Sequence, residues 1–244
     1  MFTLLRKWIG INLDDLLLCG GVVGGLFLLV QIIIGCVMRF GRPETSITLS
    51  GILLPAAAAF LLLAVTLAHV MISFPMMLQM GQSRRWALGI TLGAVGFETA
   101  FTIALTALLT WVESTFSPAL WQWLSGARAV VLGDGLLSSP LPGSGGVLFI
   151  EDFSISWWLF LLIPLAGVAV GFVMGAAIQR FGNRATWIFW AFFVLVGLAP
   201  QTVPSYAVVQ RQELLYSLPI LGAGCLLAGL VWSVWSLLHA VVRS

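Results

Sequence analysis

Long apolar runs separated by short polar segments make up most of this chain. A membrane-spanning helix needs about 20 consecutive apolar residues, and six runs are close to or above that length. We therefore predict spans at about residues 16–38, 49–72, 86–111, 157–178, 187–205 and 214–241. The pattern predicts an all-α integral membrane protein with six transmembrane helices in a single transmembrane domain, residues 1–244, and an outer segment at residues 112–156.

The segments outside the spans carry weaker helical signals. Residues 1–15 place apolar side chains on one face at helical spacing, which predicts an N-terminal helix lying in the membrane interface, with a frayed terminus as the alternative. Asp14 and Asp15 precede the first run, which argues against a cleaved signal peptide. In the outer segment, Ser117-Pro118 predicts the start of an interfacial helix, residues 133–146 a loop, and residues 147–155 a short, extended stretch.

The composition agrees with a membrane protein. Only 8% of the residues are charged and the mean hydropathy is +1.08, whereas a soluble domain has about 25% charged residues. The three cysteines lie inside apolar runs, and with only two histidines, His69 and His239, the sequence predicts neither a disulfide framework nor a metal site.

The distribution of basic residues predicts the orientation. Seven of the eleven basic residues fall on the side of the two termini, namely Arg6, Lys7, Arg84, Arg85, Arg180, Arg184 and Arg243. The positive-inside rule then places both termini in the cytoplasm. Prolines fall in the outer parts of four spans, which predicts either a deformable outer half or ordinary kinked packing.

The inner loop between the second and third spans has the most distinctive pattern. It reads FPMMLQMGQSRRWALG from residue 74 to residue 89: a short apolar turn, a polar break, two arginines and a tryptophan. We expect a short amphipathic helix that offers a handle to a soluble partner. The Arg84-Arg85 pair is alternatively only a topology anchor. Ser83 lacks the following glycine that a nucleophile elbow requires.

Few other residues offer chemistry. Glu98 lies within the third span, where a carboxyl group marks a candidate translocation path, or else a structural hydrogen bond. Glycine pairs spaced for close helix packing occur in the first span at Gly21 and Gly25, and in the fourth at Gly171 and Gly175. The chain has one lysine, Lys7, and no phosphate-binding loop motif, so hydrolysis of a nucleotide would require another subunit.

The loop SFPMMLQMGQSRRWALG and the basic turn QRFGNR at residues 179–184 resemble the corresponding loops of bacterial ATP-binding-cassette (ABC) transporter permeases of the small, six-span exporter type (the type-2 ABC permease family). The resemblance implies that residues 75–85 contain a cytoplasmic coupling helix that docks on a nucleotide-binding subunit. The coupling residues would be Pro75, Met76, Leu78, Gly81, Ser83, Arg84 and Arg85.

The resemblance also implies partners and a location. The chain would be the non-enzymatic transport subunit of an exporter in the bacterial cytoplasmic membrane, paired with a second copy or a related permease. ATP and Mg would bind the partner ATPase subunits and no cofactor would bind this chain; the other partner is membrane lipid, and no nucleic acid is expected. Lipid, peptide, drug or polysaccharide would be the exported substrate. The alternatives are an intramembrane enzyme and a passive channel or scaffold.

Overall fold

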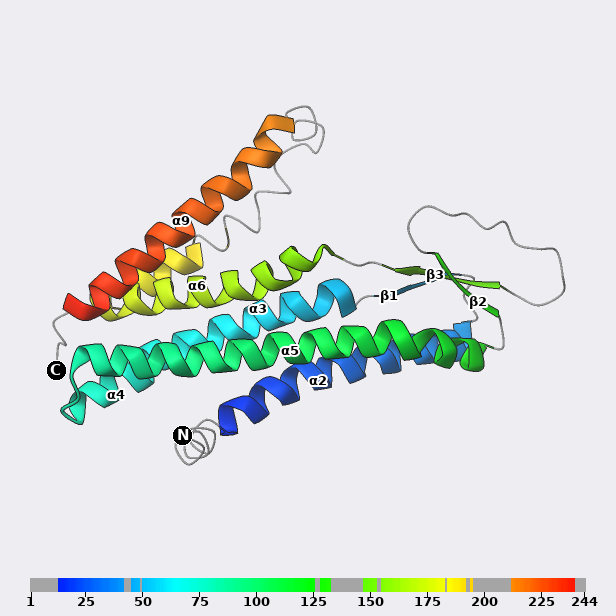
Figure 1. The fold of residues 1–244 in the computed structure, drawn as a ribbon, viewed down its shortest axis with the longest axis horizontal. Helices are drawn as coiled ribbons and strands as arrows, with labels where there is room; N and C mark the ends of the chain where they lie inside the picture. Colours follow the sequence, from blue (N-terminus) through cyan, green and yellow to red (C-terminus); the bar gives the residue numbers. More distant parts are fainter. Residues whose placement is uncertain are drawn as a thin grey trace. The chain divides into compact units, whose positions relative to one another are not determined.

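The structure is a computed structural model that describes residues 13–41, 45–48, 50–125, 128–132, 147–152, 155–182, 184–191, 194 and 212–239. Helices dominate it (Figure 1). The helical elements are α2 (Leu13–Cys36), the π-helical η1 (Val37–Gly41), α3 (Ser50–Ala68), the π-helical η2 (His69–Ser73), α4 (Phe74–Gln79), α5 (Arg84–Ser125), α6 (Trp157–Phe181) and α9 (Gln212–His239).

Four helices in the described part of the chain are long and apolar enough to cross a membrane: Leu13–Phe40, Ser50–Gln79, Arg84–Trp121 and Trp157–Phe181. They coincide with the first four predicted spans, so the prediction of a helical membrane protein is confirmed. The predicted fifth span falls mostly outside the described residues. The predicted sixth span corresponds to α9, whose stretch Leu226–His239 is apolar but shorter.

The third span is longer than the sequence indicates. Helix α5 continues to Ser125 and contains Pro118 in its interior, so the prediction of a helix start at Ser117-Pro118 is wrong. A proline inside a helix costs about 3 kcal/mol, which side-chain contacts on both sides of it must offset. Ser117 donates a hydrogen bond to Gln31 Oε1 of α2 at 3.2 Å, and Trp121 packs against Met38 of η1.

Two further predictions concern short helices. The predicted N-terminal interfacial helix lies outside the described residues, apart from Asp14 and Asp15, which are in the first turn of α2. Helix α4 occupies the place of the predicted coupling helix. However, Ser73 and Phe74 both have α-helical backbone angles, so α4 continues the helix that contains η2 and is not a separate helix.

A small parallel sheet is present in addition to the helices. Its strands are β1 (Thr45–Thr48), β2 (Arg128–Leu132) and β3 (Val147–Asp152), in the order β1-β3-β2. Both neighbours pair in parallel with β3. The extended stretch predicted near residue 147 corresponds to β3. Because a hydrocarbon environment does not accommodate open sheet edges, this sheet must lie outside the apolar part of a bilayer.

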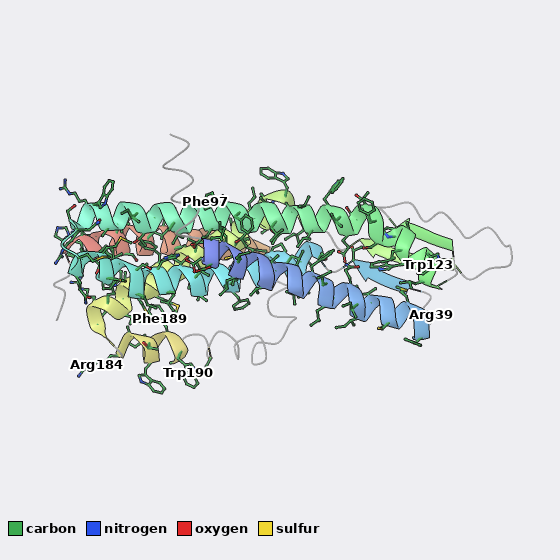
Figure 2. The ribbon with its side chains drawn as sticks, turned by 90° about the horizontal axis from the view of Figure 1, so that it is seen from below. Arg39, Phe97, Trp123, Arg184, Phe189 and Trp190 are labelled. Atoms are coloured by element: carbon green, nitrogen blue, oxygen red, sulfur yellow. The ribbon has the colours of Figure 1, made fainter. Side chains whose placement is uncertain are left out.

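The chain divides into two compact units. Unit 1 contains Met1–Leu61 and Phe97–Leu165, and unit 2 contains Leu62–Gly96 and Ala166–Ser244. The sheet lies in unit 1, near the C-terminal end of α2. Figure 2 labels two residues there, the exposed Arg39 of η1 and Trp123 of α5. Within unit 1, Val23, Phe27 and Leu54 form a buried cluster that joins α2 and α3, with side chains of α5 packed against it.

Unit 2 has a separate hydrophobic core around η2 and the start of α4. Val70, Phe74, Leu88, Phe172 and Leu237 are buried together there, so segments from η2, α4, α5, α6 and α9 meet. Phe74, the residue that begins α4, is only 1% exposed. The segment predicted to project from the membrane is therefore anchored in this core by its first residue.

The four glycines expected to pack helices differ in their surroundings. A Cβ added to Gly171 would lie 2.6 Å from the backbone oxygen of Leu63, and one added to Gly175 would lie 2.7 Å from Val70. Helix α6 thus approaches α3 and η2 closely at both glycines. In contrast, a Cβ on Gly21 or Gly25 would meet nothing within 4 Å in the part of the chain that the structure describes.

We predict that Gly171→Ala will lower the thermal unfolding midpoint of the purified protein, because the new methyl group would clash with a backbone oxygen that cannot move away. Overpacking of this kind costs about 1–3 kcal/mol. The matched control is Gly24→Ala, where the added Cβ meets nothing within 4 Å; an equal loss of stability in both variants would contradict the close approach of α6 to α3.

Candidate functional site

The loop after α4 is closed by backbone hydrogen bonds. Gln82 N donates to Met77 O at 3.2 Å, and Gly81 N donates to Leu78 O at 3.0 Å. This pair of bonds defines a Schellman motif, which places its C′ residue in the left-handed region. Gly81 occupies that position with φ of +81°. Gly81 and the backbone of Leu78, both predicted coupling residues, therefore set the geometry of the turn.

Ser83 begins the next helix. Trp86 N donates to Ser83 Oγ at 3.4 Å, which is the bond of an N-cap side chain to the third residue of its helix. The Ser83 carbonyl also accepts the first helical hydrogen bond, from Ala87 N at 2.9 Å. Ser83 thus caps α5, as expected of a serine at this position rather than of a nucleophile.

Pro75 leaves a backbone acceptor without its helical donor. In η2 the bonds span five residues, as Phe74 N donates to His69 O. The next donor in that register would be the nitrogen of Pro75, which carries no hydrogen. Its acceptor would be Val70 O, and this oxygen instead accepts a hydrogen bond from Gln179 Nε2 of α6. Gln179 therefore compensates for the proline within unit 2.

The two predicted arginines have different surroundings. Arg84 is half-buried and donates to the backbone oxygen of Leu238 at 3.3 Å, next to the last residue of α9. A cation at a helix C-terminus is favourable, because it satisfies carbonyl groups that lack helical donors. Arg85 is exposed, and no ion pair to it is present among the described residues. Arg84 holds α9, whereas Arg85 is available to other molecules.

Large apolar side chains surround Arg85 in the sequence. Met76, Met80 and Trp86 are 57%, 63% and 62% exposed. They come from α4, the turn and the start of α5, on both sides of the Schellman motif. Together with Arg85 they form what we call the turn surface: Met76, Met80, Arg85 and Trp86.

The second basic turn of unit 2 is arranged differently. Arg180, in the last turn of α6, lies over the rings of Trp232 and Trp235 of α9, with its Cζ atom 5.9 and 5.4 Å from their centroids. Phe181 stacks on Trp232 as well, with 6.2 Å between the ring centroids. The cation therefore joins α6 to α9 through cation–π contacts. Arg184, on the helical residues that follow, is exposed (Figure 2).

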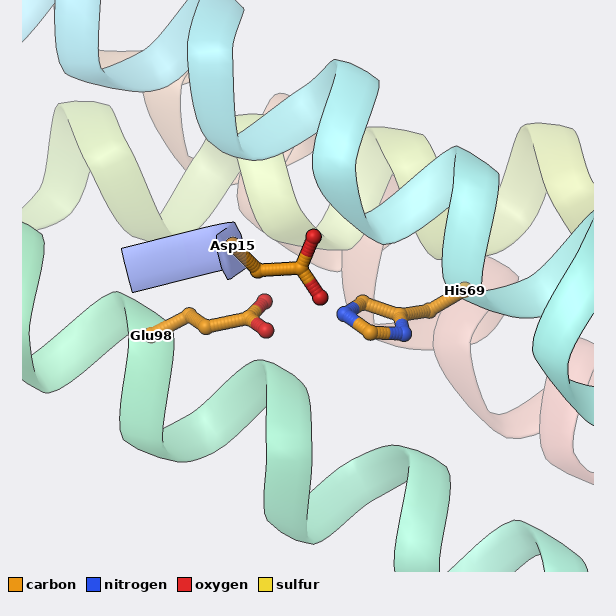
Figure 3. Close-up of side chains that lie close together, drawn as sticks. All are labelled: Asp15, His69 and Glu98. Atoms are coloured by element: carbon orange, nitrogen blue, oxygen red, sulfur yellow. The ribbon is translucent and has the colours of Figure 1, made fainter. Parts of the chain in front are cut away.

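Glu98 lies in unit 1 beside a second carboxyl group. It is fully buried in α5, and Figure 3 shows it next to Asp15 from the first turn of α2. Carboxylate oxygens of the two residues lie within 4.8 Å of each other. Figure 3 also draws His69, which belongs to unit 2 and contacts Ser73 there.

A different carboxyl group of unit 1 is bonded by side-chain and backbone donors from two other helices. Glu113 is 1% exposed. Its Oε1 accepts from Gln31 Nε2 at 2.6 Å, and its Oε2 accepts from the backbone nitrogen of Ser50 at 3.0 Å. Ser50 begins α3, so Glu113 supplies a negative charge to the N-terminus of another helix, where the dipole favours it.

Sequence reasoning did not identify Gln31, Glu113 or Gln179 as important. Gln31 gave the clearest signal, because an amide inside an apolar span needs a hydrogen-bonding partner. For Gln179, the signal was Pro75, because a proline in a helix leaves a backbone carbonyl without its donor. The sequence does not show which residue bonds that carbonyl. Glu113 gave no signal, since the third span was predicted to end before it.

Comparisons with known proteins returned no match: no family model, curated protein or solved structure is similar to this chain.

We predict that Gly81→Ala will destabilise the protein by about 1–2 kcal/mol, the cost of the left-handed conformation for a residue with a Cβ. Gly81→Asn should cost less, because asparagine tolerates this conformation. Thermal unfolding in detergent measures both. Gly89→Ala, in α5 with nothing within 4 Å of the added Cβ, is the matched control and should be neutral or stabilising; equal losses at both positions would exclude the Schellman turn.

We also predict that Pro75 and Gln179 are energetically coupled. Gln179→Met should cost about 1–3 kcal/mol in the native background, because it leaves the buried Val70 carbonyl without a donor. In a Pro75→Ala background, the restored amide can donate to that carbonyl and the same substitution should cost much less. A double-mutant cycle on unfolding free energies measures the difference, and strict additivity would contradict the compensation.

Proposed function

We propose that this chain is the membrane-spanning permease subunit of an ATP-driven exporter of the ABC class, and that the turn surface docks on a separate nucleotide-binding subunit. The observation that carries the proposal is the combination of an ordered turn with exposed apolar and cationic side chains. Met76, Met80 and Trp86 are each more than half exposed, on a loop whose two ends are closed by the Gly81 and Ser83 hydrogen bonds.

The composition of the turn surface supports a protein partner. Tryptophan, methionine and arginine are enriched at the centres of protein interfaces. A loop that is already ordered loses little conformational entropy on binding, so more of the contact energy remains as affinity. The adjacent residues Gln79, Gln82 and Ser83 are polar and exposed, which favours an aqueous rather than a lipid environment for the turn.

The electrostatics of α5 support the same conclusion. Arg85 is in the first turn of the helix, where the helix dipole disfavours a positive charge by about 0.3–1 kcal/mol. Arg84 has a compensating bond to the end of α9, but Arg85 has no ion pair among the residues described. An acidic group on a partner would supply that interaction. Anchoring of Arg85 to lipid headgroups under the positive-inside rule is the competing explanation.

In this proposal, closure of the ATPase subunits pushes on the turn and the movement is transmitted through the core that contains Phe74. That core joins α4 to α5, α6 and α9 within unit 2. The direct connection from Arg84 to α9 gives a second route. The buried Glu98 would line the translocation path, where a carboxyl group provides a polar surface within the membrane.

We predict that Arg85→Glu will weaken co-purification with a co-expressed nucleotide-binding subunit by about ten-fold or more, the effect of losing an interface residue worth at least about 1.4 kcal/mol. Trp86→Ala should have a similar effect. The measurements are co-purification from membranes and stimulation of the partner's ATPase in proteoliposomes.

Two controls separate docking from anchoring. Arg39→Glu makes the same change at an exposed arginine on η1 and should leave binding intact. Arg85→Lys preserves the charge required for anchoring but not the planar donor geometry of arginine, so a docking role predicts partial loss. Normal binding and normal ATPase stimulation in both Arg85→Glu and Trp86→Ala would refute the proposal.

A further inference from the structure

Arg180 of unit 2 lies at the end of a membrane-spanning helix, where lipid headgroups are expected. Helix α6 is long and apolar enough to cross a bilayer, and Arg180 is its first charged residue, in its last turn. The 25 residues of α6 extend over about 37 Å, whereas the hydrocarbon core of a bilayer is about 30 Å thick. A helix of this length that crosses the core places its last turn among the headgroups.

Aromatic rings hold the guanidinium group of Arg180 without using its hydrogen-bond donors. Its Cζ atom lies 5.4 Å from the ring centroid of Trp235 and 5.9 Å from that of Trp232. The Trp235 ring is contacted in turn by His239, whose Nδ1 donates to the Trp235 carbonyl at 2.8 Å. A cation–π contact uses none of the five N–H donors of arginine. Arg180 is exposed, and it forms no hydrogen bond or ion pair with the residues that the structure describes, so these donors are available to an acceptor from outside.

The amino-acid sequence of unit 2 offers Arg180 no acidic partner. The unit has a single acidic residue, Glu213, against six arginines: Arg84, Arg85, Arg180, Arg184, Arg211 and Arg243. Glu213 is in the first turn of α9, about 28 Å along that helix from Trp232. At this distance a carboxylate cannot pair with a cation beside Trp232 and Trp235. An anion that neutralises Arg180 would therefore come from outside the unit.

An exposed apolar stripe on α9 leads away from the same arginine. Leu227, Val231 and Trp235 are spaced four residues apart, so they share one face of the helix, and they are 64%, 72% and 50% exposed. The stripe runs for about 12 Å from Trp235 toward the middle of α9. A soluble acidic partner would leave it uncovered. A phospholipid would supply both an anionic group for Arg180 and hydrocarbon for the stripe.

We propose that Arg180, positioned by Trp232 and Trp235, binds the phosphodiester of an anionic phospholipid whose acyl chain lies along Leu227 and Val231. The guanidinium group is planar and donates two parallel hydrogen bonds to phosphate oxygens. An anionic lipid is favoured over a zwitterionic one, because the excess of arginines in unit 2 repels the cation of a zwitterionic headgroup. This inference is independent of the exporter proposal, since it uses only unit 2 and requires no ATPase partner.

The test uses the full-length chain in detergent with equimolar phosphatidylglycerol and phosphatidylcholine, and native mass spectrometry counts the lipids that stay bound. We expect the protein to retain phosphatidylglycerol preferentially. Arg180→Gln should weaken this binding about five-fold, the equivalent of about 1 kcal/mol for one arginine at an anionic surface. Arg180→Lys preserves the charge but not the planar donor geometry and should lose less. Trp235→Leu removes the ring that positions Arg180 but preserves an apolar side chain, and it should also weaken binding.

The matched control is Arg39→Gln, which removes an exposed arginine of η1 in unit 1 and should leave the retention of phosphatidylglycerol unchanged. Thermal unfolding without added lipid identifies any variant that fails to fold; if Arg180→Gln fails, Arg180→Lys and Trp235→Leu decide. Equal losses in Arg39→Gln and Arg180→Gln, or no preference for phosphatidylglycerol in the native protein, would overturn the proposal.

Two further measurements exclude other anions. Displacement of phosphatidylglycerol by an equal concentration of glycerol phosphate would overturn the assignment to a lipid, because a soluble phosphate would then suffice. Unchanged lipid retention in Arg180→Gln together with reduced co-purification of a co-expressed nucleotide-binding subunit would assign Arg180 to a protein partner and also overturn it. We expect glycerol phosphate to displace little lipid, because it has no acyl chain to cover the stripe on α9.

Discussion

A backbone group that is buried at a helix end or break and lacks its helical partner costs free energy unless a side chain bonds it, and in this protein side chains from other helices do so. Three backbone groups at helix ends or breaks illustrate it. The Val70 carbonyl, which lacks its helical donor because of Pro75, is bonded by Gln179. The Ser50 nitrogen at the start of α3 is bonded by Glu113, and the Leu238 carbonyl near the end of α9 is bonded by Arg84. In each case the partner comes from a different helix, so satisfying the backbone also fixes how two helices pack.

This requirement divides the residues of the turn into two groups. Gly81, Ser83 and Arg84 complete hydrogen bonds or backbone conformations that the protein needs in the absence of a partner. The side chains of Met76, Met80, Arg85 and Trp86 make no such bond among the described residues, and they are large and exposed. Because the first group makes the turn ordered, the second group is presented in a defined arrangement, which is the condition for recognition with a low entropic cost. A motif read from the sequence as one functional unit thus consists of residues that order the turn and a separate set of exposed side chains.

The sequence predicted the four described spans because runs of apolar residues are a local property that needs no knowledge of packing. It also predicted the turn, since Gly81 and Ser83 have strong local preferences. It failed where tertiary contacts override local signals. Pro118 should have begun a helix, but Ser117 and Trp121 contact α2 and η1, so α5 continues through it. The pairing of Glu113 with Ser50 spans 63 residues and cannot be read from a local pattern. The sheet was missed in the same way, since its three strands pair only over long separations.

The continuation of α5 beyond the predicted span means that unit 1 extends past the length that a bilayer requires. A helix of 42 residues is about twice as long as the hydrocarbon requires, so one part of it must leave the apolar region. The polar network of Glu113, Ser117 and Gln31 marks the part that leaves, because its charge is stabilised by hydrogen bonds near the start of α3. Trp111 precedes this network by about half a turn, and Trp157 begins α6. The same long-range contacts that keep α5 helical past Pro118 thus also carry it beyond the apolar region.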